Sequence, residues 1–116
     1  MSEMKHPRIW FKEDMKRALL AGKKTTTTRY KQHKNALYLA VTGSYYDAKP
    51  FAVIQIVSSE AMTWDDVLSW HYAEEGFESP WHMEKWGREQ KLLKGSGYLE
   101  DHVYLHHLLV VGVPHA

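Results

Sequence analysis

Eight consecutive residues, Gly22 to Arg29, form the densest set of side chains in the sequence that could take part in chemistry. The segment reads Gly-Lys-Lys-Thr-Thr-Thr-Thr-Arg, so it places three cations around four hydroxyls and contains no apolar residue. Its ordinary interpretation is a helix that ends at the glycine, followed by an edge strand of β-branched threonines. A purely structural strand normally alternates apolar and polar residues. The composition therefore favours a functional site in this segment as well as a strand.

A threonine hydroxyl becomes an effective nucleophile only when a nearby base takes its proton. Lysine can be that base when burial or neighbouring cations lower its pKa. Lys24 meets this description, because Lys23 and Arg29 are close to it in the sequence. Arg29 is also a candidate to stabilise an oxyanion formed after attack.

Glu74 and Glu75 form the second notable feature, because we predict that they lie at the C-terminal end of a helix that stops at Gly76. The helix dipole is negative there, so a carboxylate is disfavoured by about 0.3 to 1 kcal/mol. Mutual repulsion and burial would favour a protonated carboxyl that acts as a general acid. The alternative is that both are simply exposed to solvent. His71 lies one helical turn before Glu75 and could contact it.

The eight histidines raise the question of a metal site, above all His102, His106 and His107. On a strand, His102 and His106 share a face but lie about 13 Å apart, which is too far for both to bind one ion. We therefore expect no metal and no other cofactor.

The net charge of +1 hides a strong asymmetry along the chain. Residues 1–50 hold eleven Lys and Arg against four Asp and Glu, a net charge of +7, whereas the remainder has a net charge of −6. Such a basic segment attracts phosphates and other anions. Its cations could equally pair with acids from the second half of the chain. Four aromatic residues in or beside this basic half could stack on nucleic-acid bases, although most aromatic residues in a domain of this size are core: Trp10, Tyr30, Tyr45 and Tyr46.

The periodicity of the sequence predicts the elements that must position these side chains. Helices are expected over 12–21, from a Thr63 cap to about Glu75, and over about 79–93. Strands are expected over 25–30, 36–42, 51–58 and 102–113, with an extended lead-in over 8–11. Alternation along 25–30 places the odd-numbered residues on one face and the even-numbered residues on the other.

The 116 residues are long enough for one domain with a real core, and 44% of them are hydrophobic. The absence of cysteine excludes disulfides, thiolate metal sites and cysteine nucleophiles. No apolar run is long enough to span a bilayer and the first residues lack a secretory signal pattern, so we expect a cytoplasmic protein without a membrane partner. The strands are too short and too hairpin-like for a doubly wound parallel sheet. The expected fold class is α+β, a small mixed or antiparallel β-barrel with flanking helices.

Two ordered motifs resemble those of the ASCH domain, a small β-barrel family related to the PUA RNA-binding domains. The first motif, Gly-x-Lys-Thr-x-Thr-x-Arg, is matched at 22–29, and the second, Glu-Gly-Phe, is matched at 75–77. The resemblance covers nearly the whole chain, so it implies one PUA-like domain over 1–116. The sequence departs from the family pattern in the loop after Arg29, which lacks a Gly-Asp pair, and in a longer tryptophan-rich segment over 81–97.

Small bacterial members of that family are amidohydrolases that remove the acetyl group from N4-acetylcytidine. By position, the resemblance implies Lys24, Thr27 and Glu75 as catalytic residues, with Glu75 as the proton donor to the departing amine. We expect Thr27 and Arg29 to face the pocket, and Thr26 and Thr28 to be structural. Substrate-binding roles are expected for four further residues: Lys23, Thr25, Arg29 and Tyr30.

The leading hypothesis is therefore an amidohydrolase that acts on an acylated pyrimidine nucleoside such as N4-acetylcytidine. The alternative is a non-catalytic module of the same fold that binds single-stranded RNA, and a ribonuclease is a weaker third option. The oligomeric state is left open by the sequence.

Overall fold

The computed structural model describes residues 6–93, 95 and 97–113, which form three helices and a five-stranded mixed sheet. In chain order the elements are β1 (Arg8–Trp10), α1 (Glu13–Leu20), β2 (Thr26–Arg29), β3 (Leu37–Thr42), β4 (Lys49–Thr63), α2 (Trp64–Trp70), α3 (Pro80–Glu89), the short 3-10 helix η1 (Tyr98–Glu100) and β5 (His102–Gly112). This is the α+β class expected from the sequence.

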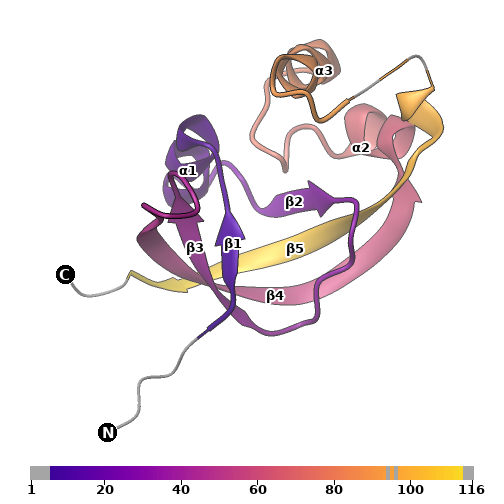
Figure 1. The fold of residues 1–116 in the computed structure, drawn as a ribbon. Helices are drawn as coiled ribbons and strands as arrows, with labels where there is room; N and C mark the ends of the chain where they lie inside the picture. The colour runs from indigo at the N-terminus through magenta and orange to yellow at the C-terminus, as the bar shows by residue number, and fades with distance from the viewer. Residues whose placement is uncertain (1–5, 94, 96, 114–116) are drawn as a thin grey trace, which may run out of the picture.

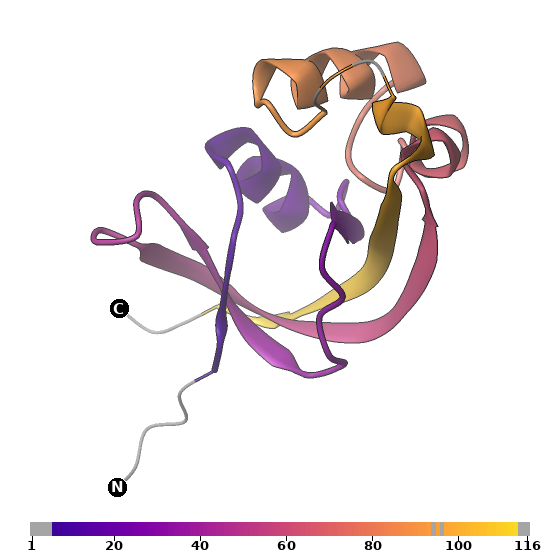
Figure 2. The same ribbon diagram turned by 45° about the vertical axis from the view of Figure 1, so that its right-hand side comes forward.

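The sheet order is β1-β3-β4-β5-β2, with β1 parallel to β3 and every other neighbouring pair antiparallel. The sheet is strongly curved, and α1 and α3 lie above its concave side (Figures 1 and 2). The edge strands β1 and β2 are connected across the open side by a side chain, because Arg29 Nη2 donates to the carbonyl oxygen of Trp10 at 2.7 Å. The guanidinium group of Arg29 thus bridges the two edge strands of the sheet.

Strand β4 is longer than expected, since it continues from the predicted end at Ser58 to Thr63. Residues 59–63 are too polar to predict a strand, but they pair with His102 to His106 of β5 after a register shift at Ile56/Ser58. The partner strand therefore determines the length of β4.

The second helix is shorter than expected. Thr63 caps α2 in a reciprocal capping box with Asp66, as the sequence predicted, but the helix ends at Trp70 and residues 71–76 form turns. The prediction that Glu75 lies on a helix was wrong. Helix α3 also stops earlier than predicted, at Glu89 rather than near Leu93.

The buried apolar residues form two clusters. The first joins α1 to β1, β3 and β4, and the second joins α2, α3 and η1 to β5. Phe77 packs against both clusters. The segment that carries Glu75 and Phe77 therefore lies where the two halves of the molecule meet.

Candidate functional site

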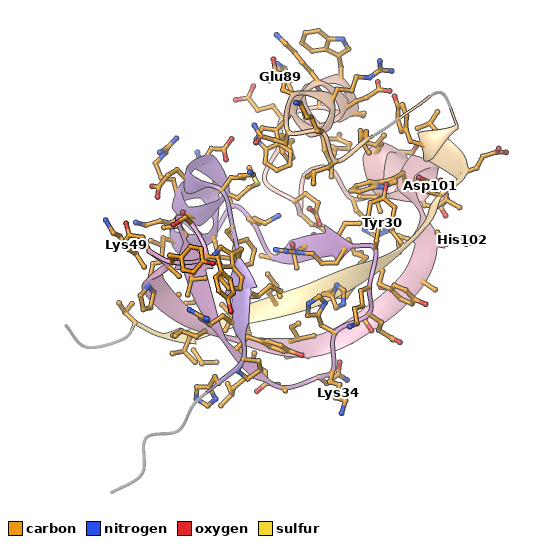
Figure 3. The ribbon with its side chains drawn as sticks, viewed as in Figure 1. Tyr30, Lys34, Lys49, Glu89, Asp101 and His102 are labelled. Carbon is orange, nitrogen blue, oxygen red and sulfur yellow. The ribbon has the colours of Figure 1, made fainter. Side chains whose placement is uncertain are left out.

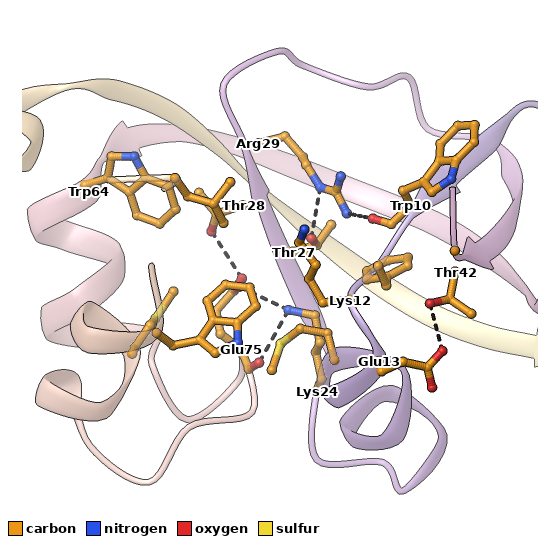
Figure 4. Close-up of a pocket in the computed structure, with 16 residues that line it drawn as sticks. Trp10, Lys12, Glu13, Lys24, Thr27, Thr28, Arg29, Thr42, Trp64 and Glu75 are labelled. Carbon is orange, nitrogen blue, oxygen red and sulfur yellow. Dashed lines mark hydrogen bonds and ion pairs between the residues drawn. The ribbon is translucent and has the colours of Figure 1, made fainter. Parts of the chain in front are cut away.

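A cavity of about 510 Å³ opens on the concave side of the sheet and is lined by residues of β1, α1, β2, α2 and α3 (Figure 4). Its volume is typical of small-molecule sites. The walls are largely aromatic or apolar, and they include Trp10, Trp64 and Trp86. A few polar groups converge inside it from the two sequence motifs: Lys24, Thr27, Thr28, Arg29 and Glu75.

Lys24 and Glu75 form a buried ion pair in this cavity. Lys24 Nζ lies 3.1 Å from Glu75 Oε1 and 3.3 Å from the Glu75 carbonyl oxygen, and each residue is only 4% exposed. Fifty-one positions separate the two residues in the sequence. Tertiary structure thus brings the cation of the first motif against the carboxylate of the second.

Two threonines complete the hydrogen bonding of the Glu75 carboxylate. Thr26 Oγ1 donates to Glu75 Oε2 at 2.7 Å, and Thr28 Oγ1 donates to the same oxygen at 3.1 Å. The even-numbered face of β2 therefore holds the carboxylate, which satisfies a buried charge that would otherwise be costly. Thr26 and Thr28, expected to be only structural, position a site residue.

Backbone contacts hold Glu75 in place against β2. The carbonyl oxygen of Glu74 accepts from the amides of Thr25 at 2.7 Å and Thr26 at 3.2 Å. The turn then reverses at Gly76, whose φ of +101° is a conformation that a side chain disfavours. His71, expected to contact Glu75, instead pairs through Nδ1 with Glu74 Oε1 at 2.7 Å.

Burial lowers the pKa of Lys24 from its ordinary value, because the ammonium loses its hydration. The Glu75 carboxylate opposes this shift, and the Arg29 guanidinium adds a smaller lowering. A lysine with a lowered pKa is a better proton acceptor near neutral pH than a solvated one.

Thr27 and Arg29 share the odd-numbered face of β2, as the alternation predicted. Arg29 Nε donates to Thr27 Oγ1 at 3.2 Å. In the part of the chain that the structure describes, the Thr27 hydroxyl donates to no acceptor, so its proton is available to a group in the cavity. The guanidinium also lies over the Phe11 ring at 5.1 Å, and burial lowers the pKa of Arg29.

His106, considered from the sequence only as a metal ligand, is fully buried behind Thr27. Its Nε2 accepts from the His33 amide at 2.9 Å, so the ring proton belongs on Nδ1, which lies 3.2 Å from the Thr27 carbonyl oxygen. Burial lowers the pKa of His106, which favours this neutral form. The imidazole thereby fixes the backbone of the proposed nucleophile.

Three of the residues expected to bind substrate do not line the cavity. Lys23 and Thr25 are exposed, and Thr25 contributes only its backbone to the contact with Glu74. Tyr30 lies beyond the end of β2, where its hydroxyl accepts from Trp64 Nε1 at 2.8 Å and lies 3.3 Å from Asp101 Oδ2 (Figure 3). Tyr30 thus supports a wall of the cavity from behind.

Several lining residues were not predicted from the sequence. Trp86 reaches the cavity from α3, where its Nε1 donates to Asp14 Oδ2 of α1 at 2.5 Å. Glu13 lies at the exposed rim and accepts from the Thr42 hydroxyl at 3.0 Å. Only the packing of distant elements brings these groups together.

Among residues 6–93, 95 and 97–113, no group of three or more His, Asp or Glu side chains is arranged to hold a metal ion. Over the same residues, no helix combines the length and apolar character needed to cross a bilayer.

No protein-family model and no curated protein matches this sequence. Solved structures do match. Protein EF3133 of Enterococcus faecalis, described under the family model DUF984, is 18% identical with a TM-score of 0.68, over 96% of this chain and 80% of that one.

Two structures described as ASCH proteins are also similar. A mutant of ZmASCH from Zymomonas mobilis is 14% identical with a TM-score of 0.62, over 91% of this chain and 70% of that one. An ASCH domain from Lactobacillus crispatus is 19% identical with a TM-score of 0.56, over 91% of this chain and 79% of that one. The chain therefore has the ASCH-domain fold, as its motifs suggested.

Proposed function

We propose that the protein is an amidohydrolase that removes the acyl group from an acylated pyrimidine nucleoside such as N4-acetylcytidine. The observation that carries this proposal is the buried pair of Lys24 and Glu75 in the same aromatic cavity as Thr27. A lysine with a lowered pKa, a hydroxyl with a free proton and a cationic donor are the parts that acyl transfer requires.

In the proposed mechanism, the planar base lies between the aromatic walls of the cavity. Neutral Lys24 takes the proton of Thr27, and Oγ1 attacks the carbonyl carbon of the acyl group. The carbonyl oxygen becomes an oxyanion, which the guanidinium of Arg29 stabilises. When this intermediate collapses, the bond between the carbonyl carbon and N4 breaks and the acyl group remains on Thr27 as an ester.

The departing amine needs a proton, and Glu75 provides the route. Lys24 Nζ lies 3.1 Å from Glu75 Oε1, so the proton taken from Thr27 passes to Glu75 and from there to N4. Glu75 begins as the acceptor of three hydrogen bonds and becomes a donor only during the reaction. Water then hydrolyses the ester, which releases the acid and restores the Thr27 hydroxyl.

Incubation with N4-acetylcytidine and separation of cytidine by chromatography tests this proposal. We expect turnover by the wild type, and a loss of about 100-fold or more in Lys24→Ala and Thr27→Val, because general base and nucleophile are removed. Lys85→Ala, which changes an exposed lysine of α3, is the matched control and should retain activity. No turnover by the wild type, or turnover indifferent to both changes, contradicts the proposal.

The second candidate is a non-catalytic module that binds single-stranded RNA, supported by the +7 charge of residues 1–50. Its affinity for RNA should fall steeply as salt rises, because bound phosphates release counterions. A ribonuclease is the weaker third candidate, since no histidine is among the described residues that line the cavity.

A further inference from the structure

Two exposed aromatic rings lie beside the rim of the cavity, next to Trp10, which lines it. Trp10 stacks on Tyr45 with ring centroids 6.1 Å apart and an angle of 16° between the planes, and Tyr46 meets Tyr45 edge-on at 5.3 Å. The guanidinium of Arg8 lies 5.1 Å from the Trp10 ring and 5.7 Å from the Tyr45 ring. We call Arg8, Trp10, Tyr45 and Tyr46 the aromatic shelf.

The folding of this chain does not account for the shelf. Tyr45 is 68% exposed and Tyr46 is 96% exposed, and neither belongs to the two buried clusters. Rings that are this exposed gain little free energy from burial in the folded state. Grouped exposed aromatic residues more often mark a binding surface.

The loop that carries the two tyrosines is tightly built. Gly43 has φ of +97°, and a Cβ at that position would lie 2.6 Å from the carbonyl oxygen of Asp47. The Asp47 amide donates to Ser44 Oγ at 3.0 Å and closes the turn. A preformed loop presents the rings to a ligand at a low entropic cost.

The shelf is continuous with the cavity. Trp10 and Gly43 belong to the cavity lining and also lie at the base of the shelf. Arg29 connects the two places directly, because it donates through Nε to Thr27 and through Nη2 to the carbonyl oxygen of Trp10. A ligand that fills the cavity and extends past its rim on this side therefore meets the shelf.

Cations lie at and beside the rim, together with the Glu13 carboxylate, which accepts from the Thr42 hydroxyl. Among the ion pairs of the described residues, Asp47 is paired with Lys49, whereas Arg8 and the rim residue Lys12 take part in none. A cation beside stacked rings is the combination that holds single-stranded nucleic acid, since rings bind base faces and cations bind phosphates.

We propose that the aromatic shelf binds the nucleotide adjacent to the one in the cavity, so that the preferred ligand is a single-stranded oligonucleotide rather than a free nucleoside. The identity of the ligand in the cavity rests on the proposed function. The shelf adds a second subsite, in which a neighbouring base stacks on the exposed tyrosines and its phosphate meets Arg8 or Lys12.

Fluorescence anisotropy with a labelled single-stranded oligocytidylate of about ten nucleotides tests the shelf. We expect the double variant Tyr45→Leu with Tyr46→Leu to bind roughly 5-fold to 100-fold more weakly than the wild type at one salt concentration. The matched variant Tyr45→Phe with Tyr46→Phe keeps both rings and should bind like the wild type. Trp81→Leu removes an exposed ring of α3 and should also leave the affinity unchanged.

The outcomes separate the shelf from the proposed reaction. Equal affinity of the leucine variant and the wild type for the oligonucleotide contradicts the proposal that the shelf binds a nucleotide. An absence of oligonucleotide binding by the wild type contradicts it too, and would leave the rings as a contact for another protein. If oligonucleotide binding depends on the two rings but N4-acetylcytidine is not hydrolysed, the nucleotide-binding role of the shelf is supported and the proposed reaction is contradicted. Hydrolysis of the free nucleoside at the wild-type rate by the leucine variant supports two separate subsites.

Discussion

At the scale of single residues, the site is organised by one buried ion pair. Burying Lys24 and Glu75 costs several kcal/mol of desolvation per ion, and a pair of apolar side chains would often be at least as stable. The fold meets this cost with three donors to one carboxylate, from Lys24, Thr26 and Thr28. A chain that only needed a stable strand would have no use for this arrangement, which is why we place the chemistry here.

The lowered pKa of Lys24 predicts how activity depends on pH. Only the neutral amine accepts a proton, so kcat/KM for N4-acetylcytidine should rise with pH and level off below the ordinary lysine pKa of 10.5. Glu75 raises the pKa of Lys24, so Glu75→Gln should move the rise to lower pH while it reduces the maximal rate. The measurement is a pH profile of initial rates.

Lys24→Arg is the control for that profile. Arginine keeps a positive charge at every accessible pH, so the variant should lose both the rate and the rise with pH. A wild-type profile that is flat, or that Lys24→Arg reproduces, would show that Lys24 is not the base.

At the scale of elements, β2 performs two functions with its two faces. Thr26 and Thr28 bind the carboxylate from one face, whereas Thr27 and Arg29 contribute the hydroxyl and the guanidinium from the other. Because side chains alternate along a strand, four consecutive polar residues can serve a ligand and its supporting carboxylate at once. Under the proposed function, this would account for the lack of an apolar residue in the segment.

The turn at Gly76 leaves little room for a side chain. A Cβ there would lie 3.2 Å from the Cβ of Ala18 and 3.5 Å from the Cβ of Lys24, in a backbone conformation that side chains rarely adopt. We expect Gly76→Ala to lower the free energy of unfolding by about 2 to 3 kcal/mol, and to weaken the site because Glu75 must shift. Urea unfolding measures the first effect and nucleoside turnover the second.

Gly22→Ala is the matched control for this substitution. Gly22 also has a positive φ, of +77°, but a Cβ there would meet nothing within 4 Å. Gly22→Ala should therefore lower the free energy of unfolding only by the cost of placing a side chain at a positive φ, about 1 kcal/mol. If Gly76→Ala costs no more than Gly22→Ala, the contact with α1 does not constrain the turn.

At the scale of the whole molecule, the Glu-Gly-Phe motif connects the two hydrophobic clusters. Glu75 enters the cavity, Gly76 reverses the chain, and Phe77 packs against both clusters. The position of the carboxylate thus depends on how the half with α1 meets the half with α2 and α3.

Phe77→Ala tests this connection. Phe77 is half-buried, so we expect a loss of about 2 kcal/mol in the free energy of unfolding, below the 3 to 5 kcal/mol of a fully buried phenylalanine. Phe77→Leu retains most of the apolar contact and should cost less than about 1.5 kcal/mol. Denaturant unfolding measures both, and a loss within about 0.5 kcal/mol for Phe77→Ala, typical of surface positions, would contradict the role of this residue.

Local patterns in the sequence were enough to predict most helices and strands and to single out the central residues of the candidate site. Hydrophobic periodicity and caps located the three α-helices but not the 3-10 helix η1, and alternation assigned Thr27 and Arg29 to one face of β2, because these features depend on neighbours along the chain. The two motifs also identified the ASCH-domain fold. The lengths of β4 and α2 were not predicted: pairing with β5 extends β4, and the residues after Trp70 form turns instead of continuing the helix.

The tertiary structure alone decided how the site is assembled. It placed Thr26 and Thr28 on Glu75, directed His71 to Glu74, set His106 behind Thr27, and left Lys23 and Thr25 outside the cavity. It also exposed Tyr45 and Tyr46 beside the rim. The physical reason is the same in each case: residue type and spacing determine which face of an element a side chain occupies, whereas burial and contacts depend on which distant element packs against that face.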